Sequence, residues 1–242
     1  MEYSTIAFLW ILCFTGSFIQ RVTGFGFGIF VMTMLPYILP SYGESTALSG
    51  TLAGSMSLIV AWRMRRHIVW KELLPILITF VVVSLCFVFA VSSMDEKFLK
   101  KILGAILICV SVYFFFISEK IKLKPSLPAQ IGLGSFSGMM GGLFAMQGPP
   151  AVLYFLASSE TKEKYIAQTQ TYFIIGNAMM TIFRAKAGFV TAAVGSAYCY
   201  GLVAVCLGAL IGSKVSKKIP HAVLKKIVYM YMAISGVIAL VA

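Results

Sequence analysis

Long apolar runs, separated by short polar turns, cover almost the whole chain. The runs lie at about residues 4–39, 45–62, 73–93, 98–117, 129–158, 165–184, 189–212 and 221–241. A helix of about 20 mostly apolar residues is long enough to cross a bilayer. The pattern therefore predicts an all-α polytopic membrane protein with eight transmembrane elements.

Two of these runs contain polar and glycine-rich interruptions. The first interruption, GSFIQRVTGFGFG at residues 16–28, separates apolar segments at about 4–19 and 25–39. The second, SGMMGGLFAMQGPP at residues 137–150, separates segments at about 129–145 and 149–158. Irregular backbone is tolerated at membrane depth only where it is buried in protein or lines a watery cavity. The interruptions predict two broken helices, about ten helical segments in all, and a transporter's binding site where the breaks meet.

The order of elements repeats along the chain. Residues 1–118 and 129–242 each contain a broken element followed by three spans, and a basic linker at 119–128 joins them. A shift of 121 places Gly24-Phe25-Gly26-Phe27 over Ala145-Met146-Gln147-Gly148. If each broken element starts and ends on one side, each half crosses an odd number of times. The second half is then inverted, which predicts two inverted-topology repeats.

The basic residues favour one orientation of this arrangement. With both termini outside, fourteen lysines and arginines fall inside: Arg63, Arg65, Arg66, Lys71, Lys120, Lys122, Lys124, Lys162, Lys164, Lys214, Lys217, Lys218, Lys225 and Lys226. Five fall outside: Lys97, Lys100, Lys101, Arg184 and Lys186. Positive charge collects in cytoplasmic loops. We therefore predict a multi-pass protein of the plasma or inner membrane with both termini outside and a cytoplasmic linker.

Composition narrows the class further. The chain has 242 residues, of which 60% are hydrophobic and 12% charged, and its net charge is +12. Its mean hydropathy is +0.92. Because the basic residues lie in short loops between apolar runs, the charge indicates membrane topology, with lipid as a partner, and no nucleic-acid partner. The N-terminus has no basic region before its apolar run, so we expect a retained helix instead of a signal peptide.

The sequence offers little chemistry for an enzyme or a cofactor. The five cysteines lie in apolar runs without metal-binding spacing, and both histidines lie in basic loops. No Asp or Glu lies deep in a predicted span; Glu44, at the start of one, comes nearest. There is no phosphate-binding loop and no nucleophile–base pair. We expect no catalytic residues, no metal and no cofactor.

The motifs at the two interruptions resemble those of a known family. The first is Gln20 followed by Thr23-Gly24-Phe25-Gly26-Phe27-Gly28 and Pro36; the second is Gly138-Met139-Met140-Gly141-Gly142 followed by Gln147-Gly148-Pro149-Pro150. They resemble the sulfite exporter TauE/SafE family over essentially the whole chain. The resemblance implies a transporter of sulfite or organosulfonates with two inverted halves, each opening with a helix-loop-helix. The chain departs from it at Ala145, where relatives often carry glycine.

The candidate substrate-binding residues are polar groups and helix N-termini at the breaks, together with polar residues of the spans at 45–62 and 165–184. They are Gln20, Arg21, Thr23, Gly24, Gly26, Ser49, Gln147, Gly148, Pro149 and Asn177. Free backbone N–H groups at a helix N-terminus bind oxyanions. Alternatively, the glycines only allow close helix packing, and Ser49 and Asn177 only bond neighbouring helices.

The two arginines near these segments have alternative roles. Arg21 either faces the cavity and binds an anion or extends to the lipid headgroups. Arg184 is expected at the outer interface, with a role in gating as the alternative.

These features predict a secondary transporter that exports a small sulfur-containing or organic oxyanion, such as sulfite, sulfoacetate or a similar sulfonate, by alternating access. Export of an anion from a negative-inside cell is already downhill, by about 2.3 kcal/mol per charge per 100 mV. The alternative is an anion channel, or an importer of small anions, that uses the same loops. A homodimer is possible in either case.

Overall fold

A computed structural model of the chain describes residues 3–113, 116, 125–215, 230, 233–238 and 240–241. Its elements are α1 (Tyr3–Thr23), α2 (Phe27–Val31), η1 (Leu35–Tyr37), α3 (Tyr42–Met64), η2 (Arg65–His67), α4 (Trp70–Val91), α5 (Glu96–Val112), α6 (Leu127–Phe144), α7 (Gly148–Ser158), α8 (Lys162–Lys186) and α9 (Ala192–Val215). The predicted all-α class is confirmed for these residues. Residues 119–124 of the expected linker and most of the expected span at 221–241 lie outside the described residues.

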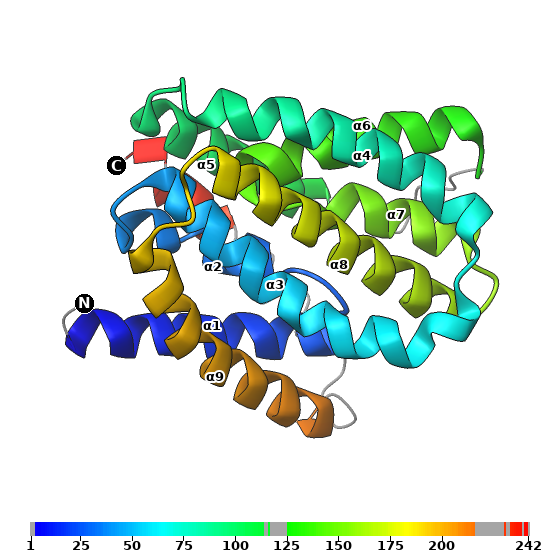
Figure 1. Cartoon of the computed structure of the whole chain (residues 1–242), viewed down its shortest axis with the longest axis horizontal. Coiled ribbons are helices and arrows are strands. Elements are labelled where there is room, and N and C mark those ends of the chain that lie inside the picture. The colour runs from blue at the N-terminus through cyan, green and yellow to red at the C-terminus, as the bar shows by residue number, and fades with distance from the viewer. Residues whose placement is uncertain are drawn as a thin grey trace.

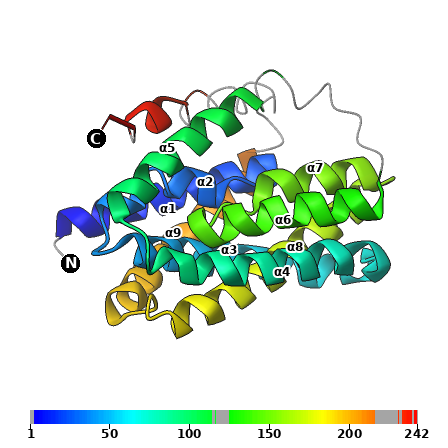
Figure 2. The ribbon, with the colours of Figure 1, turned by 90° about the horizontal axis from the view of Figure 1, so that it is seen from above.

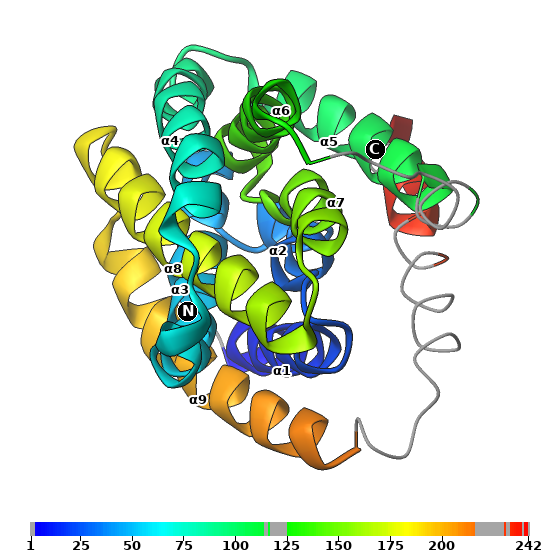
Figure 3. The same cartoon turned by 90° about the vertical axis from the view of Figure 1, so that its right-hand side faces the viewer.

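The long helices form one bundle (Figure 1). The most extensive contacts pair α4 with α6, α1 with α9, and α3 with α8. The α3–α8 pair also contacts α4 and α9, so it joins the other two pairs. In the end-on view α2 lies near the middle of the bundle (Figure 3), and its residues Phe27, Ile29 and Val31 are buried. The break that precedes α2 is therefore placed inside the protein.

Polar capping residues set where several helices begin. Ser41, Asp95, Ser126 and Thr161 each accept a hydrogen bond from the backbone N–H three residues on, at the starts of α3, α5, α6 and α8. Such caps satisfy a donor that the first helical turn leaves free. These helices consequently begin two to three residues before the apolar runs that predicted them.

The first break is shorter than its sequence suggested. We expected it to span residues 16–28, but α1 continues through Gly16, Gln20 and Arg21 to Thr23. Only the Gly24–Gly26 segment is non-helical, and Gly24 and Gly26 have φ of 90° and 107°. Gly16 serves packing instead, because a Cβ there would lie 2.9 Å from Val31 Cγ1. We also expected one apolar helical segment at 25–39, and this is wrong. Helix α2 ends at Val31, and a short 3₁₀ helix follows at Leu35–Tyr37.

The second break lies within the predicted interruption at 137–150 but is also shorter than it, because α6 continues through Gly138, Gly141 and Gly142. Helix α6 ends at Phe144, and α7 begins at Gly148. Ala145 takes the left-handed conformation with φ of 56°, which ends α6 in the way glycine commonly does. The departure from glycine at this position therefore leaves the turn intact.

Three of the described helices are long and apolar enough to cross a membrane by length and composition. They are Tyr3–Thr23, Trp70–Val91 and Ala192–Lys214. Helices α3 and α8 are as long but carry many polar residues, which face other helices: Ser45, Thr46, Ser49, Gln168, Thr169 and Asn177 are all buried. Exposed apolar side chains such as Ile78, Val82 and Leu210 lie on α4 and α9. A polar helix shielded by apolar ones remains compatible with a helical membrane protein.

Glycines on one face of α6 bring it against α4. A Cβ at Gly134, Gly138 or Gly142 would lie 2.8–2.9 Å from the carbonyl oxygens of Ile76, Phe80 and Ser84, respectively. Four-residue spacing places these glycines in one stripe along the helix. Small residues of this kind allow the close backbone approach typical of membrane helix pairs. They fix the position of the helix that carries the second break.

Helix α5 lies diagonally beside the rest of the bundle, with the described C-terminal residues near it (Figure 2). Gly236 contacts it closely, since a Cβ at this position would lie 2.7 Å from the carbonyl oxygen of Gly104. The end of the chain therefore packs against the last helix of the first half.

Candidate functional site

The two breaks meet inside the bundle. Gly28, at the start of α2, packs against the carbonyl oxygen of Ala145 so closely that a Cβ would overlap it. A Cβ at Gly148, the first residue of α7, would lie 3.7 Å from Cβ of Phe25. We call these segments, residues 23–28 and 145–148, the first and second tip. Glycine at position 28 lets backbone from one break approach backbone from the other, whereas a Cβ at Gly148 would make only ordinary van der Waals contact.

Side chains of α1 hold the first tip. Gln20 Oε1 accepts a hydrogen bond from the N–H of Phe27 at 3.2 Å, so it caps the short helix α2. Thr23 Oγ1 lies 2.9 Å from the carbonyl oxygen of Ile19 and 2.6 Å from that of Phe25. These two predicted site residues therefore hold the turn in place through hydrogen bonds to its backbone.

A chain of hydroxyl groups holds the second tip. Tyr172 donates to Ser137 Oγ at 2.7 Å, and Ser137 donates to the carbonyl oxygen of Gln147 at 2.6 Å. Gln147 Nε2 donates to the carbonyl oxygen of Phe173 at 3.4 Å, whereas its buried Oε1 has no partner among the described residues. The tip is thus tied to α6 and α8 with one amide oxygen still available.

Few backbone donors remain free at the second tip. Ala145 and Met146 donate to the carbonyl oxygens of Gly141 and Met140. Pro149 and Pro150 have no N–H group. The first N–H groups of a helix have no acceptor within it. The donors that the start of α7 can offer a ligand are therefore those of Gln147 and Gly148.

A small cavity of about 30 Å³ lies between the tips. Its lining comes from both tips, α3 and α8: Gln20, Gly26, Gly28, Ile29, Ala53, Ser57, Ala145, Met146, Gln147, Gly148, Phe173 and Asn177. Five residues predicted from the sequence are among them, namely Gln20, Gly26, Gln147, Gly148 and Asn177. The two interruptions thus contribute to one polar cavity, together with two polar helices.

A larger cavity of about 490 Å³ lies beside the first tip, between the ends of α1, α3 and α9 and the start of α8. Arg21, Gly24 and Arg63 line it, and Gln20 lines both cavities. We call this larger cavity the approach. Arg21 is exposed and lines the approach, so its guanidinium belongs to the approach and not to the small cavity. Two arginines give the approach a positive potential, which attracts anions.

The two remaining candidates lie outside both cavities. Ser49 is fully buried, and its Oγ lies 3.5 Å from where a Cβ of Gly28 would be; this hydroxyl has no partner among the described residues. Pro149 lines an apolar cavity of about 350 Å³ toward α5. Ser49 therefore packs against the first tip, and Pro149 faces away from the polar site.

Sequence reasoning misplaced one residue. Arg184, expected at the outer interface, is only 1% exposed. Its Nη2 donates to the carbonyl oxygen of Gly141, near the end of α6, at 2.8 Å. Its position near the end of α8 suggested an interface, but α3 and α6 enclose it. Among the cavity-lining residues, Ala53 and Ser57 were also missed, although small residues four apart on α3 mark a face that other backbone can approach.

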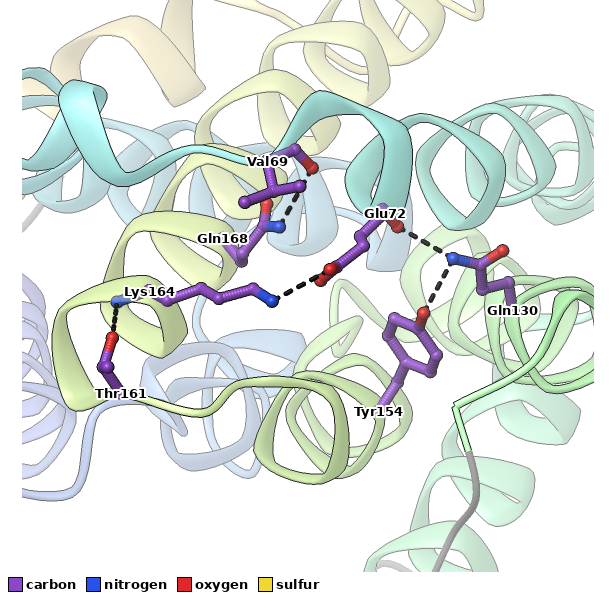
Figure 4. A network of polar contacts seen from close by, with 7 residues as sticks. All are labelled: Val69, Glu72, Gln130, Tyr154, Thr161, Lys164 and Gln168. Carbon is purple, nitrogen blue, oxygen red and sulfur yellow. Dashed lines mark hydrogen bonds and ion pairs between the residues drawn. The ribbon is translucent and has the colours of Figure 1, made fainter.

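A polar network anchors α7 and α8 to α4 (Figure 4). Lys164 Nζ lies 2.8 Å from Glu72 Oε1. Gln130 Nε2 donates to the carbonyl oxygen of Glu72 at 3.0 Å and to the hydroxyl of Tyr154 at 2.7 Å. Gln168 Nε2 donates to the carbonyl oxygen of Val69 at 3.0 Å. These contacts fix the start of α8 and the part of α7 that lies away from the second tip.

Over the residues described, no three His, Cys, Asp or Glu side chains gather closely enough to hold a metal ion. The polar groups that do gather are amides, hydroxyls and guanidinium groups. All of these can donate hydrogen bonds, and such donors suit an oxyanion.

Comparison with known proteins agrees with this chemistry. Residues 9–238 match the family described as sulfite exporter TauE/SafE. The chain is 24% identical over 231 residues to the probable sulfite/organosulfonate exporter TauE of Cupriavidus necator, an alignment that covers 88% of this chain and 85% of that protein. No solved structure matches the chain. Because the match spans nearly all of its length, the chain belongs to the TauE/SafE family, whose members are membrane transporters and not enzymes.

Proposed function

We propose that the protein exports a small sulfur-containing or organic oxyanion, such as sulfite, sulfoacetate or a similar sulfonate, and holds it between the two tips. The meeting of two broken helices around one cavity is the observation that carries this proposal. The side-chain amides of Gln20 and Gln147 line this cavity, together with the start of α7, where the N–H groups of Gln147 and Gly148 are the available backbone donors. The name of the Cupriavidus relative supports the substrate class.

The proposed mechanism is alternating access between two inverted halves, residues 1–118 and 129–242. In support, α1 and α6 begin at opposite ends of the bundle, and each is followed by a helix that turns back (Figure 1). The α3–α4 and α7–α8 turns lie at one end, and the start of α1 and the α8–α9 turn lie at the other (Figure 1). Since the first end carries Arg63, Arg65 and Arg66, we place it in the cytoplasm and both termini outside.

The two cavity sizes favour a carrier over a channel. The approach lined by Arg21 and Arg63 measures about 490 Å³, whereas the space between the tips measures about 30 Å³. An open pore would need more space between the tips, because about 30 Å³ is room for little more than one water molecule. We infer that the anion collects at the cytoplasmic approach and passes only when the tips rearrange.

Exchange measurements on purified protein in liposomes test this function. Labelled sulfite inside the vesicles is expected to leave faster, and with saturation, when unlabelled sulfite is present outside. A flux that rises linearly with concentration and ignores external sulfite would indicate a channel. A thermal-shift screen of sulfite, sulfonates, carboxylates and phosphate would then identify the preferred anion.

Gln147→Ala is expected to weaken sulfite binding about tenfold, equivalent to about 1.4 kcal/mol, because it removes a side-chain amide from the cavity. Calorimetric binding to the purified protein measures the change. Gln168→Ala is the matched control, since Gln168 is also buried but bonds Val69 away from the cavity. Equal affinities of the Gln147 variant and the wild type would remove this side chain from the site.

A further inference from the structure

Arg184 has unused hydrogen-bonding capacity in a buried position. Its Nη2 donates to the carbonyl oxygen of Gly141, but Nε and Nη1 have no partner within the described part of the chain. Nor does any carboxylate described in the structure form an ion pair with it; the pair that is seen joins Lys164 to Glu72. A buried guanidinium with unpaired donors destabilises a fold, and within a membrane protein it usually serves a function.

The guanidinium lies next to the residues of the tip cavity. A Cβ at Gly50 of α3 would lie 2.7 Å from Arg184 Nη1 and 3.6 Å from Asn177 Oδ1. Asn177 lines the cavity, and Gly141 accepts hydrogen bonds both from Arg184 and from the N–H of Ala145 in the second tip. Gly50 therefore leaves room for a cation that contacts Gly141, the residue to which the second tip is also bonded, and that lies close to Asn177.

The order of residues along α8 places Arg184 beyond the tip cavity, on the side opposite the approach. Ile166 and Gln170 line the large approach, Phe173 and Asn177 line the tip cavity, and Arg184 follows two helical turns later. An anion moving from the approach through the tips would meet Arg184 next. Arg21, by contrast, lies before the tips.

We propose that Arg184 is a substrate-binding residue, whose guanidinium binds the negative charge of the small oxyanion on the outer side of the tips. This inference rests on the proposed transport function and adds the group that supplies positive charge within the membrane. The structural alternative is that Arg184 only neutralises the carbonyl end of α6, where a cation is favourable.

Arg184→Met separates these roles. If Arg184 binds substrate, sulfite affinity falls at least about tenfold, while the thermal midpoint without substrate stays equal or rises because an unpaired buried charge is gone. Arg184→Lys, which keeps the charge, is expected to recover part of the affinity. Arg65→Met is the matched control, because Arg65 is an exposed cation in η2. A lower midpoint with unchanged affinity would show that Arg184 is only a helix cap.

Gly50→Ala provides a second test that does not change charge. The added methyl group would displace Nη1, so sulfite affinity is expected to fall several-fold, whereas Gly195→Ala, at a position with open space, should have no effect. Wild-type affinity in Gly50→Ala overturns the proposal, even if the Met variant fails to fold. The proposed function is judged separately on the wild-type protein: absence of any oxyanion binding there overturns both.

Discussion

Gly28→Ala is expected to reduce sulfite exchange at least about tenfold, because overpacking of a close contact costs about 1–3 kcal/mol. The new methyl group would overlap the carbonyl oxygen of Ala145, which is backbone and cannot rotate away as a side chain could. The two tips would have to separate, and the cavity between them would change shape. Initial rates of exchange in liposomes measure the effect.

The control for this variant is Gly132→Ala. Gly132 lies in α6, and an added Cβ there would meet nothing within 4 Å, so the exchange rate of this variant should match that of the wild type. An unimpaired Gly28→Ala protein would show that the contact between the tips is not required for transport. A variant that fails in exchange but keeps its helical content and thermal midpoint would locate the defect at the tips.

Gly138→Ala is expected to lower the stability of the fold by about 1–3 kcal/mol, because this glycine belongs to the packed stripe between α6 and α4. A methyl group there would lie 2.8 Å from the carbonyl oxygen of Phe80, 2.8 Å from Val83 Cβ and 3.1 Å from the N–H nitrogen of Ser84. Two of these are backbone atoms, so the helices must move apart. Thermal unfolding of the purified protein in detergent measures the change.

The same substitution at Gly132 should act in the opposite direction. Gly132 is an exposed residue of the same helix, and alanine there gains about 1 kcal/mol of helix propensity. Gly132→Ala should therefore raise the thermal midpoint while Gly138→Ala lowers it. Equal shifts in the two variants would mean that the stripe does not hold α6 against α4.

The sequence predicted where the second break ends better than where the first one begins, because the physical signals differ. Gly148-Pro149-Pro150 can only start a helix, since proline lacks the N–H that a helix interior needs. In the first interruption, Gly16 looked like part of the break, yet it is a helical residue that lets α2 pack against α1. A glycine that bends the chain and a glycine that allows close packing are alike in a sequence; only the neighbouring helix distinguishes them.

The site shows the same limit. Polar residues within apolar runs identified Gln20 and Gln147 at the breaks and Asn177 in the run at 165–184, because an amide within an apolar run needs a polar environment. Arg184 was assigned to an interface because it lies near the end of its run. Its burial depends on α3 and α6, which approach it from distant parts of the sequence. The local pattern of polar and apolar residues contains no information about neighbours that are distant in the sequence.

Crosslinking the tips tests the central claim that substrate passes between them. In a variant with the five native cysteines replaced, Phe25→Cys and Gly148→Cys place two Cβ atoms about 3.7 Å apart, within the usual range for a disulfide. Oxidation is expected to stop sulfite exchange, and reduction to restore it, while the exchange rate of each single-cysteine variant is the same under both conditions. Full exchange by fully crosslinked protein would contradict the account, because the tips would then not need to separate.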